Sequence, residues 1–252
     1  RDTPYVPGAE LAGTVARVGD GVEGFTAGDR VWAHPGLTGA TAELVAVAAG
    51  HLGHAPRSLP LREAASAPVG VLTAAQALDV LELEPGQRLL VLAAGGNVGA
   101  YAVQLARLQD ATVFAQAAGD DAARLRADGA HTVLDRHADW VASARAAAPD
   151  GVDALLDPLG GESLAAALPL VRDGGRVATL IPRDGHDAAP RGIQVTAVVV
   201  RPDGARLTRL ASAFDDGRLR THPGPVFPMD DAAAAHRAQE QGVAGKVVIT
   251  VG

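Results

Sequence analysis

The sequence predicts an α/β protein in which a doubly wound, mostly parallel sheet is inserted in a second, β-rich domain. Between residues 73 and 222, short apolar runs without alternation are separated by segments of helical periodicity. This order is typical of strands buried on both faces and joined by helical crossovers. The apolar run Arg88–Ala93 ends at a group of glycines before a helical segment, as a phosphate-binding turn does. On both sides of this region the pattern is short, β-like and rich in turns.

Within the α/β region, strands and helices are expected to alternate. The predicted strands are Arg88–Ala93, Thr112–Gln116, Thr132–Leu134, Val152–Leu156, Arg176–Ile181 and Ile193–Val200. The predicted helices are Thr73–Leu81, Val98–Leu108, Asp120–Ala127, Trp140–Ala147 and Glu162–Leu168. Right-handed crossovers between parallel strands then place helices on both faces of the sheet.

The flanking segments are expected to form a single second domain. Before the α/β region we predict strands at Leu11–Val18, Arg30–Ala33 and Ala42–Val47 and a loop at His51–Pro60. After it we predict helices at Ala205–Phe214 and Asp231–Gln241, a proline-rich loop at Thr221–Pro228 and a strand at Gly245–Val251. The predicted domains are therefore 1–72 with 223–252, and 73–222.

Composition and charge exclude several classes of protein. Hydrophobic residues make up 48% of the chain, which is ample for a core. The net charge is −7 and the basic residues are scattered, so we expect no nucleic-acid partner. The absence of cysteine excludes disulfides and thiolate zinc sites and favours a reducing compartment, hence a cytoplasmic location. No apolar run has the length needed to cross a bilayer, and we expect no membrane partner.

Several stretches, in order along the chain, resemble the medium-chain dehydrogenases/reductases. They are Val6–Val15, Gly28–Val31, Glu84–Gln87, Ala94–Gly99, Asp157–Gly161, Val226–Met229 and Gly245–Val248. The turn Ala94–Gly99, which reads AxGxxG, resembles the quinone oxidoreductase and enoyl reductase branch. The resemblance implies a Rossmann domain, 73–222, inserted in a GroES-like substrate domain. The family has further strands ahead of the Pro7–Glu10 segment, so we expect the GroES-like domain to be incomplete at its N-terminus.

The resemblance also implies chemistry without zinc. Zinc-dependent members of the superfamily carry a catalytic Cys and a His-Glu pair. This chain has no Cys, and Ala9 stands before Glu10 where those enzymes have the histidine. His34, His51 and His54 show no ligand spacing, so we interpret them as exposed loop residues and expect no metal. The implied reaction is hydride transfer from NADPH to a quinone or to an α,β-unsaturated carbonyl.

The cofactor-binding residues follow from matching positions in the family. Around the pyrophosphate we expect Gly95, Gly96, Asn97, Val98 and Gly99, and beside the nicotinamide Thr73 and Leu180. An ordinary strand–helix turn, a helix N-cap at Thr73 and a plain core position at Leu180 are the structural alternatives.

The choice between NADPH and NADH depends on the end of the second strand. Ala117 cannot hold the ribose hydroxyls as an Asp or Glu does in NAD-specific enzymes, which leaves room for a 2′-phosphate. The family's usual lysine falls at Asp121 or Ala122, but Arg136 occupies a position where relatives carry a phosphate-contacting tyrosine. Arg136, and less so Arg124, can supply the positive charge, or can be surface arginines. We predict NADPH, with NADH possible.

No catalytic side chain is predicted, because the proton can come from solvent. The only tyrosines are Tyr5, near the cleft by resemblance, and Tyr101, which we interpret as a packing residue.

The segment Gln194–Val200 is too apolar for an exposed edge strand, so we predict a homodimer with a continuous sheet. A nucleotide-binding protein without turnover, acting as a scaffold or regulator, is the alternative function.

Overall fold

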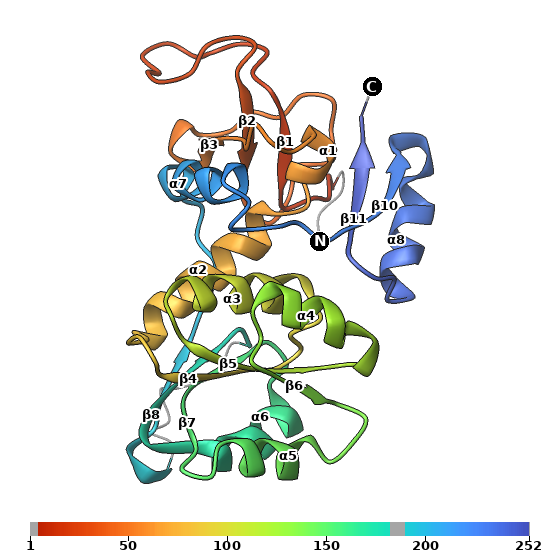
Figure 1. The fold of residues 1–252 in the computed structure, drawn as a ribbon. Helices are drawn as coiled ribbons and strands as arrows, with labels where there is room; N and C mark the ends of the chain where they lie inside the picture. Colours follow the sequence, from red (N-terminus) through yellow and green to blue (C-terminus); the bar gives the residue numbers. More distant parts are fainter. Residues whose placement is uncertain (1–4, 182–189, 252) are drawn as a thin grey trace. The chain divides into compact units, whose positions relative to one another are not determined.

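The computed structural model describes residues 5–181 and 190–251 (Figure 1), so residues 1–4, 182–189 and 252 of the predicted domains lie outside the described part. The chain divides into two compact units. One contains the chain up to Leu72 together with the chain from Arg201 onward, and the other contains Thr73–Val200. None of the described helices combines the length and the apolar character needed to span a membrane.

The Thr73–Val200 unit is built on a six-stranded parallel sheet of order β6-β5-β4-β7-β8-β9. The strands are β4 Arg88–Val91, β5 Thr112–Ala117, β6 Thr132–Asp135, β7 Val152–Asp157, β8 Val171–Thr179 and β9 Gln194–Ala197. The chain starts at the middle of the sheet, runs to one edge, returns and runs to the other. This is the dinucleotide-binding order of a doubly wound sheet, so the predicted fold class is confirmed.

Helices cover both faces of this sheet. They are α2 Pro68–Leu81, which begins in the other unit, α3 Asn97–Leu108, α4 Ala122–Asp128, α5 Trp140–Ala147 and α6 Gly161–Ala167, with short 3-10 turns η2 Gly119–Asp121, η3 Leu168–Leu170 and η4 Pro190–Gly192. In Figure 1, α3 and α4 lie over one face and α5 and α6 over the opposite face. Leu89 to Leu92 are therefore fully buried, as the run without alternation predicts.

Strand β8 starts five residues before its predicted start because its first half is irregular. Val171 pairs with Val152, but Ala154 pairs with Arg176, so the residues between them form a bulge. Gly174 has φ +69, a conformation that glycine adopts without strain. Charged residues in a bulge break the apolar pattern on which the prediction rested.

The other unit contains two smaller sheets. The antiparallel sheet is β1 Leu11–Thr14, β2 Arg30–Ala33 and β3 Leu52–His54, and the parallel pair is β10 Pro223–Pro228 with β11 Lys246–Thr250. Its helices are α1 Leu61–Ala64, α7 Gly204–Asp215 and α8 Ala232–Glu240, with 3-10 turns η1 Ala49–His51 and η5 Met229–Asp231.

Three predictions for this unit are wrong. Ala42–Val47 is not a strand, and the third strand lies in the predicted loop, where Gly53 pairs with Trp32. A Cβ on Gly53 would lie 2.7 Å from the Leu207 Cβ, so the strand needs glycine to let α7 approach. The predicted loop Thr221–Pro228 contains β10, since an edge strand of a two-stranded sheet tolerates its prolines.

The unit boundary also differs from the predicted domain boundary over 201–222. The sequence pattern assigns α7 to the dinucleotide-binding domain, but α7 packs on β2 and β3. The Phe214 ring meets Trp32 edge-on with centroids 5.6 Å apart, and the Thr208 hydroxyl accepts a hydrogen bond of 3.1 Å from the His54 N–H. A helical pattern shows one apolar face and does not show which sheet that face covers.

Candidate cofactor site

The glycine turn lies at the carboxyl edge of the parallel sheet. Beyond the end of β4, the Leu92 N–H donates to the Leu156 carbonyl of β7 (3.0 Å), and the Ala94 N–H donates to the Gln116 carbonyl of β5 (2.8 Å). The Gln116 side-chain carbonyl accepts from the Ala93 N–H at 3.0 Å. Ala93 has φ +46, which turns the chain away from the sheet at this point. The turn is therefore held by both neighbouring strands.

Helix α3 begins directly after this turn and packs close to it. The Gly96 N–H donates to the Ala93 carbonyl at 2.9 Å. A Cβ on Gly99 would lie 2.5 Å from the Ala93 oxygen and 2.7 Å from the Ala94 Cα, so only glycine fits there. The first N–H groups of a helix have no intrahelical acceptor and carry the positive end of its dipole. The backbone of this turn thus fits a dinucleotide pyrophosphate, whose charges it would meet with N–H groups.

Helix α4 covers the outer side of the turn with a charged contact. The Arg124 guanidinium donates from Nη2 to the Gly95 carbonyl (3.0 Å) and to Asp121 Oδ1 (2.6 Å), and its Nη1 lies 3.6 Å from Asp128 Oδ2. A Cβ on Gly95 would overlap the Asp121 carboxylate. The sequence comparison with the family marks Asp121 only as a position at which relatives usually carry a lysine. The available signal was an acidic residue about twenty residues after a glycine turn.

The ends of β5 and β6 meet next to this contact. The Arg136 N–H donates to the Ala117 carbonyl at 2.8 Å, which fixes the Arg136 backbone beside the end of β5. The Arg136 Nε donates to Nε2 of His137 at 3.2 Å. Ala117 itself is buried and offers no polar side chain.

The ends of β7 and β8 are joined around a buried carboxylate. Asp157 is fully buried, accepts from the N–H groups of Leu159 (3.0 Å) and Gly160 (2.9 Å), and accepts from the Thr179 hydroxyl at 2.8 Å. The Asp157 carbonyl accepts from the Leu180 N–H at 2.8 Å. Leu180 is therefore held at the carboxyl edge, half-buried rather than in the core.

The sheet edge brings together most of the predicted binding residues: Gly95, Gly96, Asn97, Val98, Gly99, Ala117, Arg136 and Leu180. Thr73 comes from α2 and is buried. Because α2 begins at Pro68, Thr73 is an interior helix residue and the N-cap alternative is wrong.

The histidine and tyrosine predictions had mixed outcomes. His34 is buried, not exposed, and its Nδ1 lies 2.7 Å from the Ala9 carbonyl. A carbonyl oxygen only accepts, so that ring nitrogen carries the hydrogen. Tyr101 is buried in α3 as predicted, whereas Tyr5 is 37% exposed. Over residues 5–181 and 190–251, no three His, Asp or Glu side chains are arranged to hold a metal ion.

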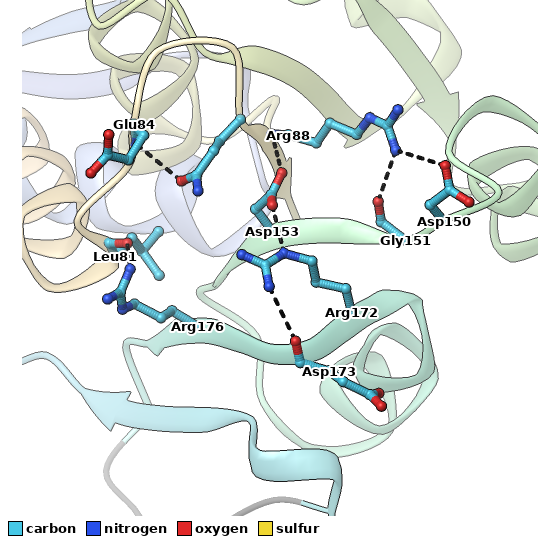
Figure 2. Close-up of polar contacts among 10 residues, drawn as sticks. Leu81, Glu84, Arg88, Asp150, Gly151, Asp153, Arg172, Asp173 and Arg176 are labelled. Atoms are coloured by element: carbon cyan, nitrogen blue, oxygen red, sulfur yellow. Dashed lines mark hydrogen bonds and ion pairs between the residues drawn. The ribbon is translucent and has the colours of Figure 1, made fainter.

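An open depression of about 490 Å³ lies at the opposite, amino edge of the sheet, and Figure 2 shows the charged side chains that line it. Its charged side chains engage one another: Arg172 Nε donates to Asp153 Oδ1 at 2.6 Å, and Arg88 Nη1 lies 4.0 Å from Asp150. Burial raises the pKa of Asp153, but hydrogen bonds from the Arg88 N–H and the Arg172 guanidinium outweigh it, so the pKa is lowered. Because these charged residues pair with one another, their contacts have a structural role. The carboxyl edge of the sheet therefore remains the candidate site.

The chain is similar to known dehydrogenases and reductases along its whole length. The alcohol dehydrogenase GroES-like domain model matches residues 1–57, and the zinc-binding dehydrogenase model matches residues 129–249. The polyketide synthase protein NorB of Streptomyces orinoci is 38% identical over 97% of this chain and 12% of its own length. The quinone oxidoreductase of Rattus norvegicus is 28% identical over 98% of this chain and 80% of its own. The solved structure of the CurK enoyl reductase has a TM-score of 0.86 at 26% identity, over 98% of this chain and 80% of that one.

The chain belongs to the medium-chain dehydrogenase/reductase family of oxidoreductases, as the sequence predicted. The fold consists of a Rossmann-type sheet and a GroES-like region. Members of this family bind a nicotinamide cofactor. The chain spans 12% or less of the length of the polyketide synthases that it matches.

Proposed function

We propose that the chain is a zinc-independent reductase that uses NADPH to reduce a quinone or an α,β-unsaturated carbonyl. The observation that carries the proposal is the glycine turn at the carboxyl edge, where a pyrophosphate fits against the start of α3. The absence of cysteine and the alanine before Glu10 support chemistry without zinc, and the first of these also supports a cytoplasmic location. The quinone oxidoreductase and enoyl reductase relatives support the class of acceptor.

Each binding residue has a distinct role in this proposal. The N–H groups at Asn97, Val98 and Gly99 receive the pyrophosphate, and Gly95 and Gly96 let the backbone come close to it. Thr73 and Leu180 orient the nicotinamide end. The bound nicotinamide supplies the hydride, and the protein supplies orientation and exclusion of water.

The 2′-phosphate is assigned to Arg136. Its backbone is fixed to the end of β5 through the Ala117 carbonyl, and its guanidinium has donors beyond the one that meets His137. A guanidinium binds phosphate through parallel N–H groups. Buried Ala117 itself contributes no side-chain carboxylate at the end of β5.

The reductase proposal is tested by following oxidation of NADPH with a panel of quinones and enones, together with a titration of NADPH binding. Turnover with at least one acceptor supports it. Binding without turnover on any of them contradicts it and supports the alternative, a nucleotide-binding scaffold or regulator.

We also propose a homodimer in which β9 pairs with β9 of a second copy. Strand β9 is the edge of the sheet, and Val199 directly after it is 67% exposed. An apolar edge strand with unpaired backbone groups favours pairing across a two-fold axis.

A further inference from the structure

Asp157 carries a fully buried carboxylate at the carboxyl end of β7, on the edge of the sheet that holds the proposed cofactor site. This carboxylate accepts three hydrogen bonds, all from neutral donors: the N–H groups of Leu159 (3.0 Å) and Gly160 (2.9 Å) and the Thr179 hydroxyl (2.8 Å). An ionised carboxylate only accepts hydrogen bonds, which matches these contacts. Over residues 5–181 and 190–251, no basic side chain forms an ion pair with it.

Two other aspartates of this unit that have little exposure are neutralised by arginines. Asp153, four residues earlier on the same strand, lies 2.6 Å from the Arg172 guanidinium, and the Asp128 carboxylate faces Arg124 at 3.6 Å. A charge that is buried without such a partner costs stability. The turn before α6 does not require the charge, because an asparagine would accept from the same N–H groups. The local structure therefore explains the side chain but not its charge.

The carboxylate is linked directly to the strand end that the proposed function places beside the nicotinamide. The Asp157 carbonyl accepts from the Leu180 N–H at 2.8 Å, and the Asp157 side chain holds the preceding residue, Thr179. The Thr179 hydroxyl oxygen in turn accepts from the Ile181 N–H at 3.3 Å. The buried charge and Leu180 thus belong to one hydrogen-bonded unit, so a ring held against Leu180 experiences the field of that charge.

A negative charge at this position discriminates between the two redox forms of the cofactor. Loss of a hydride, which is a proton with two electrons, leaves a positive charge on the nicotinamide ring that the reduced form lacks. In the proposed reaction the acceptor takes the hydride and then a proton from solvent, so the positive charge remains with the cofactor. A fixed carboxylate in a medium of low dielectric constant attracts this charge, and a bound cofactor beside it becomes a stronger reductant.

We propose that the buried Asp157 carboxylate stabilises the oxidised nicotinamide and so helps the hydride to leave the reduced cofactor. The inference rests on the proposed function, because it assumes that the nicotinamide lies against Leu180. Asp157 acts through its charge, and Thr179 is the positioning residue that holds the carboxylate at the strand end.

The test compares the dissociation constants of NADP⁺ and NADPH for the wild type and matched variants, by calorimetric titration without an acceptor. Asp157→Asn removes the charge and nearly keeps the shape. It is expected to weaken NADP⁺ binding relative to NADPH binding about tenfold, because one charge no longer acts on another at low dielectric constant. Asp153→Asn is the control, since it makes the same change on the same strand at the opposite edge of the sheet. An unchanged ratio in Asp157→Asn, or an equal change in the control, would overturn the inference.

Thr179→Val separates the charge from the geometry of the strand end. It removes one hydrogen-bond donor but keeps the carboxylate, so the two affinities are expected to fall together and their ratio to stay near that of the wild type. An equal shift of the ratio in Thr179→Val and in Asp157→Asn would assign the effect to geometry and contradict the inference.

The wild type alone supplies a further measurement, which applies even if Asp157→Asn does not fold. It is expected to bind NADP⁺ at least as tightly as NADPH, and a tenfold preference for NADPH would overturn the inference. If the wild type binds neither form, the proposed function itself fails. If it binds both and their ratio does not depend on Asp157, only the inference about Asp157 fails.

Discussion

The Arg172 guanidinium donates a 2.6 Å hydrogen bond to the Asp153 carboxylate and so ties β8 to β7 where both strands begin (Figure 2). Asp153 also accepts from the Arg88 N–H of β4 at 2.7 Å. One carboxylate therefore links three strands at the amino edge of the sheet. Its side chain is only 21% exposed, which limits screening by water.

Replacing Asp153 with Asn is expected to destabilise the Thr73–Val200 unit by about 1–3 kcal/mol, because two charge-assisted hydrogen bonds weaken. Urea denaturation followed by circular dichroism measures this change. Asp150→Asn is the matched control: its side chain is 91% exposed and lies 4.0 Å from Arg88, so it should cost little. Equal effects of the two substitutions would show that the link at Asp153 is unimportant.

Acid should remove the stabilisation that Asp153 supplies. Its pKa is lowered in the folded protein, so the folded state binds its proton less readily than the unfolded state does. The stabilisation is full above the ordinary aspartate pKa of 3.8 and is lost as the pH falls through the lowered folded-state pKa. Stability measured from pH 6 to pH 2 should therefore fall less steeply in Asp153→Asn than in the wild type. The same pH dependence of stability in the wild type and in Asp153→Asn would contradict the role of Asp153.

Gly99→Ala is expected to displace α3 from the turn, because the added Cβ meets the Ala93 oxygen at 2.5 Å. Such overpacking typically costs about 1–3 kcal/mol, and NADPH binding should weaken with it. Thermal unfolding and NADPH titration measure the two effects. Gly19→Ala is the control, since its Cβ would meet no atom within 4 Å. A Gly99→Ala protein with wild-type stability and affinity would refute the close packing.

Arg136→Gln is expected to weaken NADPH binding about tenfold or more and to leave NADH binding unchanged, since only NADPH carries the 2′-phosphate. Isothermal titration with both nucleotides measures the difference. Arg126→Gln, an exposed arginine of α4, serves as the control for loss of one positive charge. If NADH and NADPH weaken together, Arg136 acts on the fold and not on the phosphate.

The proposed dimer predicts a mass of two chains in light scattering. Val199→Glu, a change at an exposed valine beside β9, should shift that mass toward one chain, because like charges would meet across the two-fold axis. The change should leave the unfolding temperature of the monomeric unit nearly unaltered. A wild type that scatters as a single chain would exclude the dimer.

The sequence by itself determined the parallel sheet, its crossover helices and the place of the glycine turn. These features depend on local patterns: an apolar run buried on both faces, such as Leu89 to Leu92, and the glycines that follow it. The GroES-like region was recognised through its resemblance to a family, and its individual strands were predicted less well. Gly53 is required by the close packing of α7 on β3, and the prolines of β10 are tolerated because β10 is an edge strand. Neither feature produces an apolar pattern in the sequence.

The tertiary structure alone decided which distant residues meet. The burial of His34 against the Ala9 carbonyl depends on the chain folding back over a separation that no local pattern records. The same holds for Asp153, which joins β4, β7 and β8. A sequence pattern reports which residues favour burial or turns, whereas the partner of a charged group is set by strand order and register.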